Sequence, residues 1–397
     1  MKIAIIHEDL KRRGGAENLI IWYASKLTKM GYDITLFTGY YDPKNWDEKY
    51  TNNLKVKSEK CFRFTKNALV YEINGFKAYR ELKKYDLVIQ HNWMNSSQYL
   101  SFKNKYNQRW VWFCQEPPRY IYYNEIDECL IPYMLNKRHF YPHRGINILK
   151  HYLIRNFLPI FKYLDKRYVK NNFSSIIANS AFTKKNIKQI YGLNAKVAQL
   201  GVEFDEKSKN DIIDMKNKHN CEFLIYTSGR LTPSKNFYRL IKAFSTIQTE
   251  VDYRLIIAGN GPLFRFLIKK IREFKLEKRI ILPGYISKQE LISYLYSCDL
   301  LTYLTINEPF GLVPIEGMAM GKPSLVSAIG GPSETIEDGD TGFHADPFNI
   351  IDIGKKIQFI LNNKDILSSM GDNCKKTYNE RYTLDKAVYR FIDALGI

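Results

Sequence analysis

Residues 300–327 read LLTYLTINEPFGLVPIEGMAMGKPSLVS, and this stretch indicates the fold of the chain. The apolar run at 300–304 predicts a strand, a helix is expected to begin near Gly311, and the run at 323–327 predicts a second strand. Strand, helix and strand in this order are typical of a parallel βα unit. The same alternation continues along the chain, with further strands expected at 2–7, 33–38, 86–91, 109–114, 175–179, 196–200, 222–227, 253–258 and 279–282. The predicted fold class is α/β, with two Rossmann-like, doubly wound parallel-sheet domains that face a central cleft.

The length and composition agree with two folded domains. A chain of 397 residues is about twice as long as one hydrophobic core usually organises. Apolar residues make up 45 % and charged residues 25 %, which excludes a disordered or fibrous protein. We expect an N-terminal domain over 1–204 and a C-terminal domain over 205–382, with a polar linker at about 205–220. A last helix within 383–397 is a candidate to cross back onto the first domain.

The length of the apolar runs and the spacing of the cysteines indicate in which cellular compartment the protein resides. The run after Met1 is too short for a signal-peptide core, and no stretch reaches the roughly 18 apolar residues that span a bilayer. The cysteines include no Cys-x-x-Cys pair, which argues against a disulfide framework and against a zinc ribbon. They are Cys61, Cys114, Cys129, Cys221, Cys298 and Cys374. We expect reduced thiols in a cytoplasmic protein.

The formal charge of +19 is concentrated in the first half of the chain. Residues 1–200 hold 34 Lys and Arg against 16 Asp and Glu, whereas the second half is nearly neutral. Residues 137–170 interleave one acid, Asp165, and many bases with apolar side chains: Lys137, Arg138, Arg144, Lys150, Arg155, Lys162, Lys166, Arg167 and Lys170. This pattern favours an anionic membrane surface as partner, at the inner face of the cell membrane. A solvated helical face and, as the least favoured reading, nucleic acid are the alternatives.

Two glutamates mark the segment with most chemical content, EPFGLVPIEGMAMGKP at 308–323. Glu308 lies in the loop, and Glu316 is expected about two turns into the helix that begins near Gly311. The backbone amides of Gly311 and Leu312 would then stand free at a helix N-terminus, which is a ready anion site. Carboxylates on either side of this anion site suit a ligand in which a sugar, a diphosphate and a ribose follow one another. The plain alternative is a capped helix with two surface acids.

A second loop adds two cations. Arg230 ends the strand FLIYTSG, and Lys235 follows within GRLTPSKN, just before a helix. Two cations on one strand-to-helix loop can clamp a diphosphate and neutralise the charge that grows on a leaving phosphate. The Gly14–Gly15 turn lacks the third glycine of a dinucleotide fingerprint, and no GKS or GKT phosphate loop, HExxH or GxSxG motif is present.

The segments GRLTPSKN, AGNGP, LPGY, EPFGLVPIEGMAMGKP, GGPSE and DGDTGF follow one another between residues 222 and 345. In order and spacing they resemble the donor-binding domain of the family 4 glycosyltransferases, retaining enzymes of the GT-B fold, and the E-x7-E block is the most specific element. The first half resembles the family more loosely, through its Gly-Gly loop and its strand pattern. The resemblance implies a metal-independent enzyme without a cofactor, whose substrate is a nucleoside diphosphate sugar.

The resemblance also implies roles for single residues. Arg230 and Lys235 would bind the donor diphosphate, Glu308 the hydroxyls of the transferred sugar, and Glu316 the ribose of the nucleotide. Of these, Arg230, Lys235 and Glu308 would be the catalytic residues. The further donor contacts implied are Gly15, Gly259, Gly261, Gly284, Tyr285, Phe310, Gly311 and Leu312.

The acceptor side carries weaker candidates, namely His91, Gln115, Glu116 and Arg119. Gln115 stands where family members commonly place a histidine, and a glutamine donates hydrogen bonds but does not titrate near neutral pH. We therefore expect no histidine base. The leaving phosphate would itself accept the proton of the acceptor, while the protein positions the substrates and stabilises charge.

The function predicted is the retaining transfer of a hexose, of mannose or glucose type, to a glycan or lipid-linked acceptor at the cytoplasmic membrane face. Two alternatives remain open at this point. One is another GT-B activity, such as a nucleotide-sugar epimerase or a phosphorylase. The other is a non-catalytic protein that binds nucleic acid or lipid on a transferase scaffold.

Overall fold

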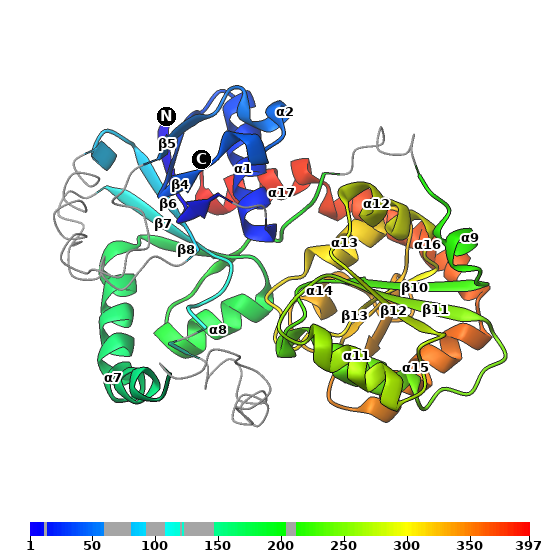
Figure 1. The fold of residues 1–397 in the computed structure, drawn as a ribbon. Helices are drawn as coiled ribbons and strands as arrows, with labels where there is room; N and C mark the ends of the chain where they lie inside the picture. Colours follow the sequence, from blue (N-terminus) through cyan, green and yellow to red (C-terminus); the bar gives the residue numbers. More distant parts are fainter. Residues whose placement is uncertain (12–13, 59–80, 93–107, 120, 123–146, 204–211) are drawn as a thin grey trace. The chain divides into compact units, whose positions relative to one another are not determined.

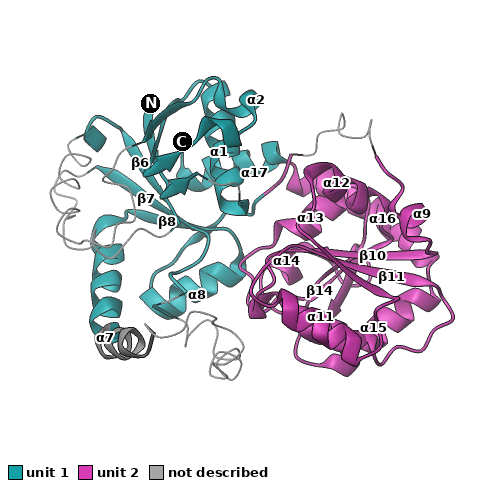
Figure 2. Ribbon diagram, in the orientation of Figure 1, with its two compact units in different colours: residues 1–126, 145–200, 384–397 teal, residues 127–144, 201–383 magenta. Residues whose placement is uncertain are grey.

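The computed structural model describes residues 1–11, 14–58, 81–92, 108–119, 121–122, 147–203 and 212–397 (Figure 1). The chain divides into two compact units (Figure 2). Unit 1 comprises residues 1–126, 145–200 and 384–397, and unit 2 comprises residues 127–144 and 201–383. Within the part of the chain that the structure describes, no helix is both long enough and apolar enough to cross a membrane.

Unit 1 is built on a seven-stranded, parallel sheet in the order β5-β3-β1-β6-β7-β8-β9. The strands are β1 (Lys2–Ile6), β3 (Asp33–Thr38), β5 (Lys55–Ser58), β6 (Leu87–His91), β7 (Arg109–Cys114), β8 (Ser175–Ala178) and β9 (Lys196–Val197), with a separate short pair, β2 (Asp9–Leu10) and β4 (Tyr40–Tyr41). The helices are α1 (Gly15–Lys29), α2 (Glu48–Thr51), α7 (Asn147–Asn172), α8 (Ala181–Tyr191) and α17 (Leu384–Leu395), with a 3-10 turn at Pro43–Asn45. The winding direction reverses between β1 and β6.

Unit 2 is built on a six-stranded, parallel sheet in the order β12-β11-β10-β13-β14-β15. The strands are β10 (Phe223–Ser228), β11 (Tyr253–Ala258), β12 (Ile280–Gly284), β13 (Leu300–Tyr303), β14 (Ser324–Ser327) and β15 (Gly342–Ala345). The helices are α9 (Met215–His219), α10 (Phe237–Phe244), α11 (Phe264–Glu273), α12 (Lys288–Ser297), α13 (Leu312–Ala319), α14 (Pro332–Thr335), α15 (Ile350–Asn362) and α16 (Ile366–Thr377), with a 3-10 turn at Pro233–Lys235 and a π-helical turn at Tyr378–Tyr382. The winding direction reverses between β10 and β13.

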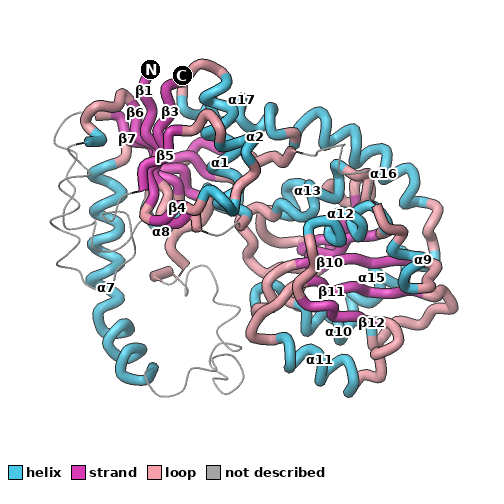
Figure 3. Tube along the Cα trace, turned by 45° about the horizontal axis from the view of Figure 1, so that its top comes forward, coloured by secondary structure: helices cyan, strands magenta, loops and turns pink. Residues whose placement is uncertain are grey.

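The central strand β10 of unit 2 is apolar along most of its length because helices cover both faces of the sheet (Figure 3). Phe223 and Ile225 of β10 join a core that also contains side chains of α10, α11 and α15. Leu224 and Tyr226, the alternate residues, join a second core with side chains of α9 and α12. This two-sided burial explains the near-continuous apolar runs from which the strands were predicted.

The predicted α/β class with two parallel-sheet domains is confirmed, and three details differ. The sequence prediction omitted the edge strands β5 and β15 and the short pair of β2 and β4. Part of the segment expected as a linker, 205–220, forms α9, because Met215 is buried against the second core. The units divide after Leu200 rather than after residue 204. The helix expected within 383–397, α17, belongs to unit 1, in agreement with its candidate crossing, and contacts α1.

Candidate active site

The loops that follow β10 and β13 meet at the carboxyl edge of the unit 2 sheet. These strands are neighbours although β11 and β12 separate them in sequence, so the winding of the sheet reverses here. Doubly wound sheets bind ligands at such a reversal, outside the carboxyl ends of their strands. Ile306 N donates a 2.8 Å hydrogen bond to Ser234 O, which ties the two loops together. The Arg230–Lys235 loop and the Glu308 loop thus form one site.

Lys235, Tyr303 and Glu308 form a compact polar group, named here the lysine cluster. Lys235 Nζ donates to Glu308 Oε2 over 2.8 Å and to the Tyr303 hydroxyl over 3.2 Å. Burial and the Glu308 carboxylate raise the pKa of Tyr303 well above its ordinary value, so this phenol stays protonated. An ammonium has three donors, and Lys235 makes no further hydrogen bond to the described residues. One N–H of Lys235 is therefore available to a ligand.

Gly311 allows the first turn of α13 to approach the lysine cluster. Its φ is 88°, and a Cβ added there would lie 2.8 Å from Cε1 of Tyr303, so no other residue fits without displacement. The preceding Phe310 is buried and anchors the loop, and no side chain caps the helix. The first amides of a helix lack intrahelical partners and carry partial positive charge. The amides at Gly311 and Leu312 therefore add backbone N–H donors to the site beside Tyr303.

Glu316 is the fifth residue of α13 and lies just over one turn from its start, not two turns in as predicted. The side chain is half-buried, and desolvation by the surrounding protein raises the pKa of its carboxyl to about 7. Its charge acts on Tyr226 of β10 and on Tyr303 of β13, which places it against the two central strands. A carboxyl that titrates near neutral pH can accept or donate hydrogen bonds to hydroxyl groups.

Arg230 is exposed, and its guanidinium makes no ion pair or hydrogen bond to other described residues. The glycines assigned to donor binding, Gly259 and Gly261, lie against its loop. A Cβ on Gly259 would meet Gly229 O at 2.0 Å, and a Cβ on Gly261 would meet Leu231 N at 2.6 Å. These two glycines thus permit the close packing that holds the Arg230 loop in place.

Two further predicted segments border the same edge of the sheet. Gly284 O accepts a 2.7 Å hydrogen bond from Gly259 N, which joins the loop after β12 to the loop after β11. Tyr285 follows with 86 % of its side chain exposed, so its ring is accessible to a ligand. On the other side, Gly331 N donates to Glu308 O over 2.8 Å. The loops after β11 and β12 are therefore joined to each other, and the segment GGPSE is joined to the Glu308 loop.

In unit 1, the Gly-Gly loop rests on a buried pair of histidines at the point where winding reverses. His7 follows β1 and His91 ends β6, and their Nδ1 atoms lie 2.9 Å apart. His7 Nε2 is 3.8 Å from Oε1 of Glu17, and the Glu17 carboxylate lies against Gly14. Gly15, the predicted donor contact of this loop, is exposed at the first position of α1.

His91 itself is only 1 % exposed, and its Nε2 has no hydrogen-bond partner. Burial and the nearby His7 lower the pKa of His91 well below its ordinary value, so the ring is neutral. The geometry gives His91 a supporting role beneath the Gly-Gly loop. Its contact with an acceptor remains a prediction.

The predicted acceptor residues Gln115, Glu116 and Arg119 share the loop that follows β7. Gln115 Oε1 accepts a 3.0 Å hydrogen bond from Asn179 Nδ2, while Gln115 Nε2 is buried without a partner. Arg119 Nε donates to Glu116 Oε1 over 2.8 Å. The loop therefore offers one unused amide donor beside an ion pair.

Asp165 of α7 anchors the loop that follows β7. It is fully buried and accepts hydrogen bonds from the hydroxyls of Tyr122 and Tyr191, each over 2.7 Å. Tyr122 lies three residues after Arg119, so the carboxylate ties the loop after β7 to the helix. A buried polar group that lacks hydrogen-bond partners lowers the free energy of unfolding by about 1–3 kcal/mol, so these two donors matter for stability.

The structure describes part of the basic stretch. On α7, Arg167 and Lys170 are exposed, and Lys162 and Lys166 are half-buried. The other bases lie outside the described residues or have no described side chain: Lys137, Arg138, Arg144, Lys150 and Arg155.

Sequence reasoning missed Tyr303, His7 and Glu17 as members of the two sites. Each lies at the carboxyl end of a predicted strand or at the start of the helix after it. The strand predictions together with the rule for parallel sheets would have selected Tyr303 and His7. No motif marks Asp165, which is notable in the sequence only as the single acid within a basic stretch.

Two protein families match the chain, one for each unit. The family described as Glycosyltransferase Family 4 matches residues 13–206, and the family described as Glycosyl transferases group 1 matches residues 208–377. The chain belongs to the family 4 glycosyltransferases. The resemblance found in the sequence is thereby confirmed.

Individual family members are distant from this glycosyltransferase. N-acetyl-alpha-D-glucosaminyl L-malate synthase of Bacillus anthracis is 28 % identical over 188 residues, which are 46 % of this chain and about half, 48 %, of that relative. The alpha-1,3/1,6-mannosyltransferase ALG2 of Dictyostelium discoideum is 25 % identical over 96 % of this chain and 95 % of its own.

Solved structures share the fold over the full chain. Anabaena HepE in complex with UDP and glucose has a TM-score of 0.73 at 19 % identity and covers 100 % of this chain and 99 % of its own. Sucrose-phosphate synthase from Thermosynechococcus elongatus has a TM-score of 0.74 at 18 % identity, with coverages of 100 % and 98 %. The fold is that of the GT-B glycosyltransferases.

Proposed function

We propose that this glycosyltransferase moves a hexose, of mannose or glucose type, from a nucleoside diphosphate sugar to a glycan or lipid-linked acceptor, with retention of configuration. The observation that carries the proposal is the lysine cluster beside the uncapped start of α13. At the point where the winding of the unit 2 sheet reverses, this arrangement brings together a cation with an available N–H, a carboxylate and uncapped backbone amides. The HepE structures that contain UDP or UDP-glucose support a nucleoside diphosphate sugar as the ligand class.

In this proposal the donor lies along the edge formed by the two loops. Arg230, Lys235 and the amides at Gly311 and Leu312 hold the diphosphate. These donors also stabilise the charge that develops on the leaving phosphate. Glu308, 2.8 Å from Lys235 Nζ, accepts hydrogen bonds from the hydroxyls of the transferred sugar next to that phosphate.

Glu316 and Tyr285 hold the nucleoside in the same proposal. The Glu316 carboxyl binds the ribose hydroxyls, and the exposed ring of Tyr285 contacts the base. The leaving phosphate accepts the proton of the acceptor hydroxyl on the same face of the sugar, because Gln115 does not titrate and His91 is buried and neutral. We propose that no metal or cofactor takes part, so turnover should persist in excess EDTA.

Thermal unfolding with GDP, UDP, ADP and the corresponding nucleotide sugars tests the donor site without an acceptor. A ligand of the native state raises the melting temperature, and one nucleotide family should do so in the wild type but not in Glu316→Ala. Glu250→Ala removes an exposed carboxylate of unit 2 and is the matched control. If no nucleotide shifts the melting temperature, the transferase proposal fails.

We propose further that unit 1 meets an anionic membrane surface through α7, which would bring the protein to the cytoplasmic face of the membrane and to a lipid-linked acceptor. The support is the basic stretch, of which Lys162, Lys166, Arg167 and Lys170 lie together on the described part of α7. Each such base contributes about 1 kcal/mol near an anionic surface.

Co-sedimentation with vesicles that contain phosphatidylglycerol tests the membrane contact. Changing the four α7 bases to glutamine should release the protein from the vesicles. An equal loss of charge in unit 2, at Lys269, Lys275, Lys278 and Lys355, is the control and should leave binding intact. Unchanged binding of the α7 variant would refute this contact.

A further inference from the structure

Unit 2 has a large groove at the edge of its sheet opposite to the donor loops. Its volume is about 1030 Å³, and it is lined by the residues that precede β10, β13 and β14 and by the faces of α16 that turn toward them. These three strands are neighbours, so the groove crosses the amino edge of the centre of the sheet. Figure 1 shows α9 and α16 at this end of unit 2 and α14 at the other. Neither the lysine cluster nor Glu316 lines it.

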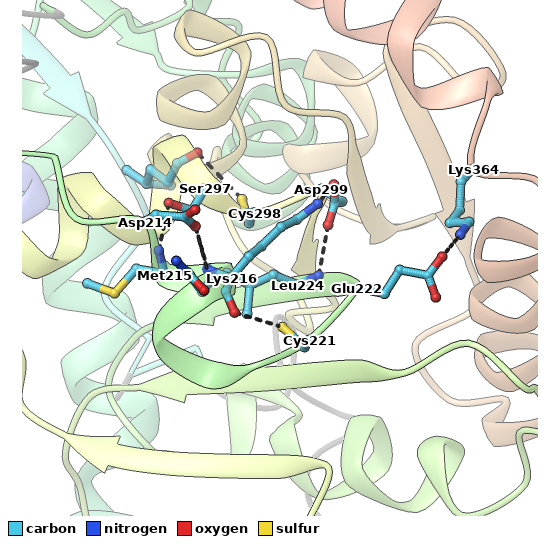
Figure 4. A network of polar contacts seen from close by, with 12 residues as sticks. Asp214, Met215, Lys216, Cys221, Glu222, Leu224, Ser297, Cys298, Asp299 and Lys364 are labelled. Atoms are coloured by element: carbon cyan, nitrogen blue, oxygen red, sulfur yellow. Dashed lines mark hydrogen bonds and ion pairs between the residues drawn. The ribbon is translucent and has the colours of Figure 1, made fainter.

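Several charged side chains of the groove form ion pairs and hydrogen bonds that connect its walls (Figure 4). Asp299 accepts from Lys216 Nζ over 2.6 Å and from the backbone N–H of Leu224 over 2.8 Å, which joins α9, β10 and the start of β13. Glu222 pairs with Lys364, which joins the start of β10 to the turn before α16. These two ion pairs cancel in charge and fix the shape of the groove.

Three other charged side chains in the groove have no such partner. Within the described part of the chain, Lys322, Lys375 and Asp372 make no ion pair and no side-chain hydrogen bond. The Lys375 side chain lies against Gly321, the residue before Lys322: a Cβ on Gly321 would lie 2.6 Å from Lys375 Cε. The two lysines outnumber the single aspartate, so the net unpaired charge of the groove is positive.

An exposed aromatic ring lies next to this pair of cations. Tyr296, at the end of α12, is 45 % exposed, and Lys322 Nζ is 5.8 Å from the centre of its ring. The groove thus offers two ammonium groups, one free carboxylate at Asp372 and one aromatic face. Ammonium groups bind phosphate oxygens through charge-assisted hydrogen bonds, carboxylates accept from hydroxyls, and an aromatic face packs against the C–H face of a sugar ring.

We propose that this groove binds a small phosphorylated sugar, with its phosphate between Lys322 and Lys375 and its ring against Tyr296. The volume exceeds what inorganic phosphate needs and lies just above the range of about 300–1000 Å³ common for small-molecule sites. Asp372, one helical turn before Lys375 on α16, accepts from the sugar hydroxyls. The site is separate from the proposed donor site and does not depend on it.

Isothermal titration of the full chain with glucose 6-phosphate tests the proposal. We expect a dissociation constant of about 10 μM to 1 mM, the range of a site with few charged contacts. Lys322→Gln and Lys375→Gln should each weaken binding about tenfold or more, since each removes a charge-assisted contact. Lys355→Gln, an exposed lysine of α15 outside the groove, should have no effect.

Three controls separate this groove from the donor site. Binding of the nucleotide identified by thermal unfolding should be the same in wild type, Lys322→Gln and Lys375→Gln, and an excess of it should not displace glucose 6-phosphate. Glucose without phosphate should not bind, and inorganic phosphate should bind more weakly.

The proposal is overturned if glucose 6-phosphate gives no binding heat at about 10 mM, a concentration that saturates even a millimolar site. It is also overturned if both groove variants bind normally while Lys235→Gln does not, since the phosphate would then occupy the donor site. Equal affinity for inorganic phosphate would exclude the sugar contacts.

Discussion

Replacing Glu316 with glutamine should make unit 2 more stable, and the gain should depend on pH. Folding raises the pKa of this carboxyl from 4.5 to about 7, because the native state desolvates it. Below pH 4.5 the carboxyl is protonated in both states. Between pH 4.5 and 7 the unfolded chain ionises it while the native state keeps the proton, so the free energy of unfolding of the wild type falls as the pH rises.

The magnitude follows from the two values. A change from 4.5 to about 7 corresponds to about 3 kcal/mol once the pH exceeds both. Because Glu316 is half-buried and retains some contact with solvent, we expect a measured gain of about 1–3 kcal/mol for Glu316→Gln at pH 8. At pH 4.5 the variant and the wild type should differ little.

Urea unfolding at pH 4.5, 6 and 8 measures this difference, with Glu250→Gln as the control for loss of a surface carboxylate. The difference in free energy of unfolding between Glu316→Gln and wild type should grow from pH 4.5 through pH 6 to pH 8. A difference that is the same at all three pH values would refute the claim that burial holds this carboxyl near neutral pH.

Three further changes test other contacts. Lys235→Ala should lower turnover by about 100-fold, since it removes a donor to the leaving phosphate; an effect below about threefold would remove Lys235 from the site. Gly311→Ala should lower the free energy of unfolding by about 1–2 kcal/mol in urea, because its φ is 88° and the added methyl meets Tyr303, and it should also reduce the thermal shift by nucleotide; an unchanged shift would contradict the placement of the α13 amides. Asp165→Ala should cost about 2–4 kcal/mol in urea unfolding, since two buried hydroxyls lose their acceptor, whereas Asp165→Asn should cost less; equal stability of both variants would contradict this role.

Local sequence patterns predicted the elements that form from one continuous segment of the chain. The strands at Asp33–Thr38, Arg109–Cys114 and Tyr253–Ala258 match their predicted bounds because each is an apolar run between polar ends. The strands β5 and β15 were missed because they lie at sheet edges, and β5, KVKS, is largely exposed and carries no apolar run. The loop that bears Glu308 was predicted from its sequence alone.

The contacts that complete each site join residues distant in sequence. Lys235 and Glu308 are 73 residues apart, and His7 and His91 are 84 apart. These residues meet only because of the order of the strands in the sheet. That order cannot be predicted from any single segment of the sequence. The raised pKa of Glu316 likewise depends on burial that a spacing of two glutamates does not reveal.

The return of α17 to unit 1 has a consequence for synthesis on the ribosome. Phe391 is fully buried, with its ring centre 4.5 Å from that of Phe113 and 5.2 Å from that of Tyr23. Lys26 pairs with Asp385 over 2.6 Å. A nascent chain that has passed residue 383 has all of unit 2 but lacks these partners of the first 200 residues. The unit translated first is therefore the one whose core closes last, and its apolar face stays exposed until α17 has been translated.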